Sequence, residues 1–244
     1  MNDGLEPEWL DSLPASDPKA DRSRRDLRLL NVLMGNAGHL AAAARRALGG
    51  RARSEVVDLG AGDGTLMLRL ARRLGPGWRD IEVVLVDRRG IVSAATRHRF
   101  ERMSWRVRTV EADVLEWLDQ PFERRASLMA ANLFLHHFNR TSLRRLLELA
   151  SRRTDCFIAC EPRRERLALG ASRCLGLLGC NAVTRHDAVL SVRAGFTAKE
   201  LSALWPANGD WASQEGPAGW FSHCFVARRR VLGPTQRAGE GGYG

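Results

Sequence analysis

Three glycines and one acidic residue stand in an arrangement that suits contact with a ligand. Gly60, Gly62 and Gly64 lie within five positions, directly after an apolar run and before a helical pattern. Glycines at a strand-to-helix turn let the backbone approach a ligand closely, and the helix that follows offers unpaired N–H groups. Thr65 stands where a dinucleotide fingerprint would place glycine or alanine. Asp58, just before the turn, would repel a pyrophosphate and attract an amino group.

Two further acidic residues stand where the next two apolar runs end. Asp87 closes the sequence VVLVD, and a carboxylate there can accept hydrogen bonds from both ribose hydroxyls. Asp113, in EADVL, can accept one from the amino group of adenine. With Asp58 they describe a ligand that has an amine, a ribose and an adenine but no phosphates, and S-adenosylmethionine has these parts. The predicted cofactor-binding residues are Asp58, Gly60, Ala61, Gly62, Gly64, Asp87, Arg88, Asp113, Val114 and Asn132.

The elements that position these residues follow an alternating pattern. Apolar runs without polar alternation are typical of strands that are buried on both faces of a parallel sheet. The sequence predicts strands at residues 55–59, 81–87, 105–110, 127–133 and 155–160, and helices at residues 63–74, 90–102, 114–119 and 140–151. Open sheets of this kind bind ligands at the carboxyl ends of their strands, which is where the glycines and acids fall.

The segments on either side of this alternation define the predicted domain organisation. Residues 1–50 are expected to form an N-terminal arm, loose over residues 1–20, followed by a helical cap. Residues 51–232 form the main domain, with a glycine-rich apolar insertion at about 163–196 that suits a substrate wall. Its last two strands are expected to join around Gly216 and Pro217. Residues 233–244 have the composition of a disordered tail.

Four short motifs, which occur in this order along the chain, resemble the motifs of a known family: DLGAGDG, VVLVD, EADVL and LFLHHF at residues 133–138. Over residues 55–161 the chain resembles class I S-adenosylmethionine-dependent methyltransferases, in particular the small-molecule branch with a Leu-His-His-Phe signature. The resemblance implies an α/β, Rossmann-like, seven-stranded and mainly parallel sheet with an antiparallel last strand, helices on both faces and an N-terminal helical cap. It also implies S-adenosyl-L-methionine as the cofactor. One departure is Ala126-Ser127, where the family usually opens strand four with Asp.

Methyl transfer to a phenol would benefit from a base, and histidines are the candidates. A phenol with a pKa near 10 is only about 0.1% ionised at pH 7, and a histidine placed on its hydroxyl can take the proton. We expect His136, His137 or His186 in this role, with Asp187 orienting His186. A helix-capping role for His136 and His137, and an exposed polar turn for His186, are the alternatives. No metal site is predicted.

The acceptor is expected to be apolar. Residues 167–179 form an apolar wall in the sequence, to which Trp205, Trp211, Trp220 and Phe221 add aromatic surface. The predicted substrate-binding residues are Phe134, Arg163, Leu167 and Trp220. The predicted reaction is therefore methylation, mainly on oxygen, of a small hydrophobic aromatic acceptor such as a phenol, a polyketide or a quinone precursor. An RNA or protein methyltransferase, and a non-catalytic cofactor-binding regulatory protein, are the two alternatives.

Composition adds three expectations about partners and compartment. The net charge is +10, but 36 of the 38 basic residues are arginines that suit solvated helix faces, so nucleic acid is not expected as a partner. The five cysteines form no CxxC pair and no secretory signal is visible, which favours the cytoplasm. No apolar run approaches the ~20 residues of a membrane span. The sequence leaves the oligomeric state open.

Overall fold

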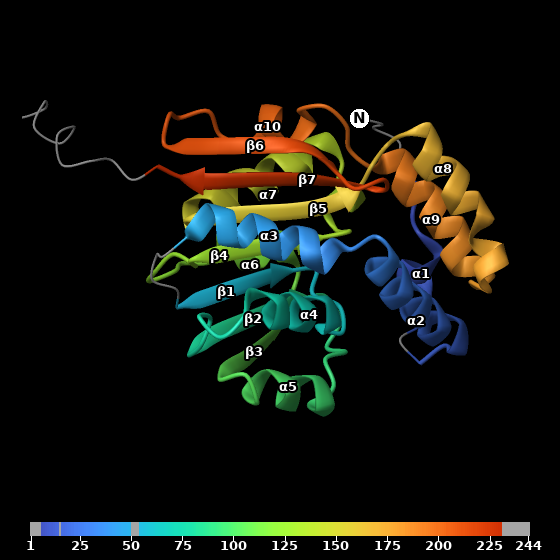
Figure 1. Ribbon diagram of the computed structural model, residues 1–244, viewed down its shortest axis with the longest axis horizontal. Coiled ribbons are helices and arrows are strands. Elements are labelled where there is room, and N and C mark those ends of the chain that lie inside the picture. Colours follow the sequence, from blue (N-terminus) through green and yellow to red (C-terminus); the bar gives the residue numbers. More distant parts are fainter. Residues whose placement is uncertain (1–5, 15, 50–53, 231–244) are drawn as a thin grey trace, which may run out of the picture.

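Seven strands form one sheet in the order β3-β2-β1-β4-β5-β7-β6 (Figure 1). The computed structural model describes residues 6–14, 16–49 and 54–230, so the predicted tail at residues 233–244 lies outside the described residues. The strands are β1 (Glu55–Leu59), β2 (Ile81–Asp87), β3 (Trp105–Glu111), β4 (Leu128–Asn132), β5 (Cys156–Pro162), β6 (Trp211–Ala218) and β7 (Ser222–Arg229). Strands β1 to β5 are parallel, and β7 runs antiparallel to both β5 and β6. The predicted fold class is confirmed.

Helices cover both faces of the sheet (Figure 1). One face packs against α3 (Asn36–Leu48), α4 (Thr65–Leu74) and α5 (Ala94–Glu101), and the other against α6 (Val114–Asp119), α7 (Arg140–Arg153) and α10 (Glu200–Leu204). Neighbouring strand residues point to opposite faces, so Val56 joins the first core and Val57 the second. Every residue of β5 is buried, as expected for a strand with a helix layer on each side.

A group of helices lies beyond the carboxyl ends of the parallel strands, and we call it the cap (Figure 1). It consists of α1 (Trp9–Ser12), α2 (Pro18–Leu33), α8 (Arg166–Arg173), the 3₁₀ helix η2 (Cys174–Leu178) and α9 (Ala182–Ala194). Buried hydroxyls join α2 to α9, because Ser23 Oγ lies 2.8 Å from Thr184 Oγ1. The Asp26 carboxylate accepts from Thr184 Oγ1 at 2.9 Å and from the Asn181 backbone N–H at 2.9 Å. The insertion after β5 and the N-terminal helices therefore pack as one unit.

Two expectations from the sequence are wrong. The segment before residue 20 is not a loose arm where the structure describes it, because it contains α1 and the first turn of α2, which Asp17 caps by accepting from the Lys19 N–H at 2.7 Å. The last hairpin does not turn at Gly216 and Pro217. Both lie inside β6, which tolerates a proline because it is the edge strand of the sheet. The chain turns instead at Gly219, whose φ is +68°.

None of the helices in the described part of the chain is both long enough and apolar enough to cross a membrane.

Candidate functional site

A cavity of about 750 Å³ lies between the carboxyl ends of the strands and the cap. Its volume is within the range of roughly 300–1,000 Å³ that small-molecule sites occupy. On the sheet side it is lined by the ends of β1, β2 and β4, together with the turns that follow them. On the cap side it is lined by α2, α8, η2 and α9. The fold thus brings the predicted strand-end residues and the insertion to one place.

The three glycines of the turn after β1 have different roles. Gly60 has a φ of +69°, and a Cβ there would lie 2.2 Å from the ring of Phe134. Gly62 has a φ of +55° with open space around it, and it lines the cavity. Gly64 is outside the cavity lining, and a Cβ there would lie 3.0 Å from Leu85. Gly60 and Gly62 therefore shape the ligand side of the turn, whereas Gly64 allows α4 to start close to the sheet.

Asp58 is a buried carboxylate that faces the cavity. Its exposed fraction is 3%, and it lines the cavity beside Gly60 and Ala61. Burial, with a smaller contribution from the charge of Asp87, raises the pKa of Asp58 to about 8. Within the described residues, the structure gives its side chain no hydrogen bond. A carboxylate left in this state has capacity for a donor that comes from a ligand.

Asp87 holds the glycine turn in place. Its carboxylate accepts a hydrogen bond from the Gly62 N–H at 2.8 Å and another from the Arg89 N–H at 2.9 Å. The two bonds use different oxygens, so each oxygen keeps capacity for a further donor. Arg88 also lines the cavity. Asp87 therefore joins the ends of β1 and β2 and still presents its carboxylate to the space between them.

The end of β3 contributes Asp113 and Val114, and both line the cavity. Asp113 is the N-cap of α6, because its Oδ1 accepts from the Leu115 N–H at 2.8 Å and from the Glu116 N–H at 3.4 Å. Capping occupies Oδ1 and leaves Oδ2 for a donor in the cavity.

Asn132, at the end of β4, belongs to a chain of amide groups. Its Nδ2 donates to Asn31 Oδ1 on α2 at 2.9 Å, and Asn36 Nδ2 donates to the same oxygen at 3.1 Å. The Asn132 Oδ1 is buried and has no hydrogen-bond partner among the described residues. It is therefore a second acceptor on the cavity wall that lacks a donor.

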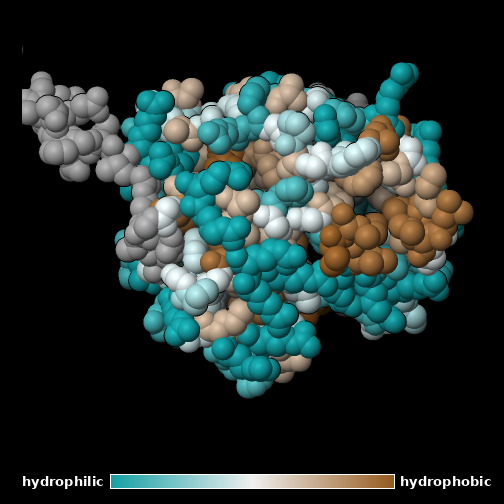
Figure 2. All heavy atoms as spheres, in the orientation of Figure 1, coloured by the Kyte–Doolittle hydropathy of each residue, from teal (hydrophilic) through white to brown (hydrophobic). Residues whose placement is uncertain are grey.

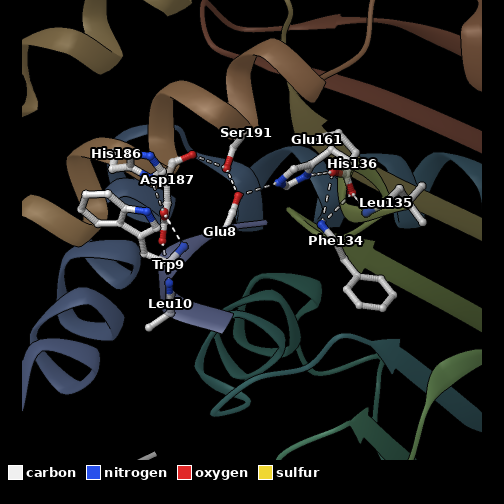
Figure 3. Close-up of polar contacts among 10 residues, drawn as sticks. All are labelled: Glu8, Trp9, Leu10, Phe134, Leu135, His136, Glu161, His186, Asp187 and Ser191. Carbon is white, nitrogen blue, oxygen red and sulfur yellow. Dashed lines mark hydrogen bonds and ion pairs between the residues drawn. The ribbon is translucent and has the colours of Figure 1, made fainter. Parts of the chain in front are cut away.

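His136 lies between two carboxylates (Figure 3). Its Nδ1 is 2.7 Å from Glu161 Oε2, and its Nε2 is 3.6 Å from Glu8 Oε1. Burial alone would lower the pKa of His136, but the neighbouring Glu161 and Glu8 outweigh burial and raise it to about 9. The two carboxylates therefore favour the protonated form of His136 in the ligand-free chain, whereas a base must be unprotonated to accept a proton. The role of His136 as a base stays a prediction.

Glu161 is fully buried at the end of β5 and fixes the loop that carries the histidines. Besides contacting His136, its carboxylate accepts from the Phe134 N–H at 3.1 Å and from the Leu135 N–H at 3.0 Å (Figure 3). These bonds hold the 3₁₀ helix η1 (Leu135–His137) against the end of the sheet. Both His136 and His137 consequently face the cavity.

Glu8 reaches His136 because α9 anchors α1 (Figure 3). The Asp187 carboxylate accepts from the Trp9 N–H at 2.9 Å and from the Leu10 N–H at 3.0 Å. The Trp9 and His186 rings stack with their centroids 3.8 Å apart. Ser191 donates to the Glu8 carboxylate, whose pKa is lowered because His136 and His137 outweigh its burial.

Several predicted residues lie elsewhere. His186 is outside the cavity lining, because its ring packs on Trp9. Arg163 is also outside and pairs with Glu165. Leu167 and Trp220 are exposed, at 52% and 71%, and do not line the cavity either. Two of the tryptophans assigned to the wall, Trp205 and Trp211, belong to the core beneath α7 and α10.

The apolar wall of the cavity comes instead from the cap. It consists of Leu27, Leu30, Leu33 and Met34 on or just after α2, Ala168 and Ala171 on α8, Leu175, Leu177 and Leu178 on η2, and Ala188 and Val192 on α9. Figure 2 shows apolar side chains gathered on the surface of this part of the molecule. Phe134 and Phe221 add aromatic rings to the lining.

Sequence reasoning missed Glu8, Asn31 and Glu161. Glu8 and Asn31 lie far from the strand ends in sequence, and no local pattern points to them. Glu161 had a signal in the sequence, since it is an acid one residue before the end of the last parallel strand, and Asp87 is an acid at the end of β2.

In comparisons with known proteins, the chain is similar to methyltransferases. Residues 56–155 match a family described as "Methyltransferase domain". A search of curated proteins finds no match. Many solved structures are similar in fold.

Three of these structures illustrate the likeness. An O-methyltransferase family protein from Burkholderia thailandensis is 17% identical with a TM-score of 0.59, over 88% of this chain and 61% of that one. The mitomycin 7-O-methyltransferase MmcR is 20% identical with a TM-score of 0.59, over 91% and 60%. The plantazolicin methyltransferase BpumL, in complex with SAH, is 12% identical with a TM-score of 0.61, over 88% and 92%. The chain thus spans about 60% of the length of the first two proteins.

Proposed function

We propose that the chain, whose residues 56–155 match a methyltransferase domain, is a class I S-adenosylmethionine-dependent methyltransferase that methylates a hydroxyl group of a small, hydrophobic aromatic molecule. The observation that supports this most is the state of Asp58, which is buried, faces the cavity and has no hydrogen bond within the described residues. The amino group of the cofactor's methionine part would supply that bond. The unpaired Asn132 Oδ1 offers the same group a second acceptor.

The other strand ends suit the nucleoside part of the cofactor. Each Asp87 oxygen already accepts one backbone hydrogen bond and has a lone pair left for a ribose hydroxyl. Asp113 and Val114 line the part of the cavity where the adenine ring, which is joined to the ribose, would bind, and Asp113 Oδ2 could accept from its amino group. Acceptors predominate on this wall, which suits a ligand with an amine and hydroxyls better than one with phosphates.

The acceptor is assigned to the space between α2, η2 and α9, because its leucines and alanines would surround an apolar ring system. Its reacting hydroxyl would lie at the polar end of the cavity, beside Glu8, His136 and His137. Holding the oxygen in line with the methyl group supplies roughly 7–11 kcal/mol of the barrier reduction. An O–CH₃ bond forms, the sulfonium C–S bond breaks, and the hydroxyl proton is released.

An arginine-lined cleft gives a second candidate. A cleft of about 720 Å³ adjoins the cavity and is lined by Arg24, Arg25, Arg28, Arg69 and Arg99. Asp63 neutralises part of this charge by pairing with Arg28 at 2.6 Å. Such a cleft suits a polyanion, so an RNA acceptor is the alternative. RNA binding that falls steeply with salt concentration would favour it.

Calorimetry with S-adenosylmethionine, NAD and ATP tests the cofactor assignment. We expect binding of S-adenosylmethionine alone, and uptake of NAD or ATP in its place would contradict the proposal. Incubation of metabolite extracts with the protein and a labelled methyl donor, followed by mass spectrometry, tests the acceptor. A labelled phenol or quinone methyl ether is expected, whereas label in RNA alone would establish the alternative.

A further inference from the structure

Three side chains at the polar end of the cavity come together from distant parts of the chain. Glu8 precedes α1, and His136 and His137 belong to η1. One carboxylate oxygen and one ring nitrogen from each histidine lie within 4.8 Å of one another. All three residues line the cavity. The donors therefore surround a common point that a ligand in the cavity can reach.

The orientation of His136 gives independent evidence that this point is a binding site. The residue is 4% exposed, and its Nε2 is buried without a hydrogen-bond partner among the described residues. Nε2 lies 3.6 Å from Glu8 Oε1, which is too long for a hydrogen bond. Two donors that each lie about 2.1 Å from one ion are separated by about 3–3.5 Å. The spacing thus suits two ligands of one cation.

The surroundings of His136 also match those of a metal ligand. A histidine that binds a metal through one ring nitrogen usually gives the N–H of the other to a carboxylate, which fixes the ring. Here Nδ1 lies 2.7 Å from Glu161 Oε2, and the Phe134 and Leu135 N–H groups hold that carboxylate in turn. Nε2 is consequently directed at Glu8 (Figure 3). A ring nitrogen of His137 lies within 4.8 Å of both other ligand atoms.

We propose that Glu8, His136 and His137 bind one divalent first-row metal cation, with its open coordination positions toward the cavity. Two imidazoles and one carboxylate are a donor set that catalytic zinc and non-haem iron sites use. Three protein ligands leave room for an exogenous oxygen. The site joins the cap to the strand ends, because α9 holds Glu8 through Asp187 and Ser191.

The role of the cation rests on the proposed function, although its binding does not. The acceptor hydroxyl would bind to the cation, which favours loss of its proton to water. The resulting oxygen anion then attacks the methyl group, and the products are a methyl ether and S-adenosylhomocysteine. Acceptors with a second oxygen next to the hydroxyl would bind in a bidentate way and are expected to react fastest.

Metal titration of the full-length, chelator-treated protein tests the site without an acceptor. The parent is a Cys174→Ser variant, because Cys174 also lines the cavity and a thiol can bind Zn²⁺. Zn²⁺ binding is followed by calorimetry and Mn²⁺ binding by electron paramagnetic resonance. We expect one ion per chain, and a loss of affinity of about 100-fold or more in Glu8→Gln and His136→Gln. The matched controls are Glu148→Gln and His98→Gln, whose side chains are 52% and 72% exposed, and they should bind like the parent.

Two results would overturn the site: no stoichiometric binding of either metal, or equal affinity in Glu8→Gln and the parent. Circular dichroism identifies variants that fail to fold. Glu8→Gln keeps the test decisive if His136→Gln unfolds, because Glu8 lies outside the sheet. Binding of S-adenosylmethionine is measured on the same samples. Metal binding without cofactor binding would refute the proposed function and leave the site intact, and the reverse would refute the site alone.

Discussion

The two ends of the cavity are built in different ways. The cofactor end consists of Asp58, the Gly60 turn and Asp87, which follow one another along β1 and β2 and are held by the parallel ladder between these strands. The other end, which we call the cluster end, consists of Glu8, His136 and Glu161, which come from three distant segments. Side-chain contacts with the cap, rather than a backbone ladder, hold Glu8 in place.

The difference shows that a backbone ladder can hold an acidic side chain in a buried position without a side-chain partner among the described residues, whereas the cap holds its acidic side chain through specific hydrogen bonds. Asp58 stays buried because its backbone is fixed between β2 and β4. Glu8 stays in place because Asp187 accepts its neighbours' N–H groups. We therefore expect changes at the cofactor end to alter global stability or cofactor affinity, and changes under the cap to act locally.

The largest expected effect is the pH dependence that Asp58 imposes on stability. The pKa of Asp58 is about 8 in the folded chain and about 3.9 in an unfolded one. Between these values the unfolded chain is ionised while the folded chain stays protonated. The free energy of unfolding should therefore fall as pH rises through this window, by up to about 1.4 kcal/mol per pH unit, and level off above pH 8.

Asp58→Asn removes this titration and isolates its effect. The difference in unfolding free energy between the variant and the parent, measured with denaturant, should shift in favour of the variant from pH 5 to pH 8. The same variant should bind S-adenosylmethionine more weakly, since Asn offers no charge to an amino group. A difference that does not change with pH would show that Asp58 is ionised throughout.

Gly60→Ala should have the next largest effect, and Gly62→Ala is its matched control. Both residues have positive φ, at +69° and +55°, so each alanine costs about 1–2 kcal/mol in backbone strain. Only at Gly60 does the new Cβ also meet the Phe134 ring, at 2.2 Å, which adds about 1–3 kcal/mol of overpacking. Denaturant unfolding of both variants measures the difference. Equal losses would mean that Phe134 moves aside without cost.

Asp87→Ala should weaken cofactor binding by about 100-fold, which corresponds to about 2.7 kcal/mol. The variant loses the acceptor that fixes the Gly62 N–H and the carboxylate that faces the ribose. Calorimetry with S-adenosylmethionine measures the change, and Asp119→Ala, with a side chain that is 55% exposed, is the control. Unchanged affinity in Asp87→Ala would contradict the proposal that the Asp87 carboxylate binds the ribose of the cofactor.

The cofactor end was predictable from the sequence because its geometry is local. The predicted bounds of the strands at residues 55–59 and 81–87 are confirmed, and a strand end fixes where the next residue points. Asp58, Asp87 and Asn132 all line the cavity. Whether they contact the cofactor is still a prediction.

The cluster end was not predictable, because its contacts join residues that no periodic pattern relates. Glu8 lies in a segment whose prolines and acids indicated a loose arm. Asp187, which is distant in the sequence, holds this segment by accepting hydrogen bonds from the Trp9 and Leu10 N–H groups. His186 and Asp187 suggested a base and its orienting acid. They hold α1 instead, which composition and spacing alone did not indicate.

The smallest and most local effect is expected for Asp187→Asn. The carboxylate accepts the Trp9 N–H with Oδ1 and the Leu10 N–H with Oδ2, and an amide keeps an oxygen at only one of these two positions. Hydrogen exchange at these two amides should accelerate by a factor that corresponds to about 1 kcal/mol, the typical value of one such bond. In Asp187→Asn, hydrogen exchange in β1 and the affinity for S-adenosylmethionine should not change. Asp155→Asn is the control, at a side chain that is 47% exposed, and it should leave both quantities unchanged as well. If Asp187→Asn weakens cofactor binding as much as Asp87→Ala does, then the two ends are one cooperative unit, and the cap contributes to the cofactor site as directly as the strands.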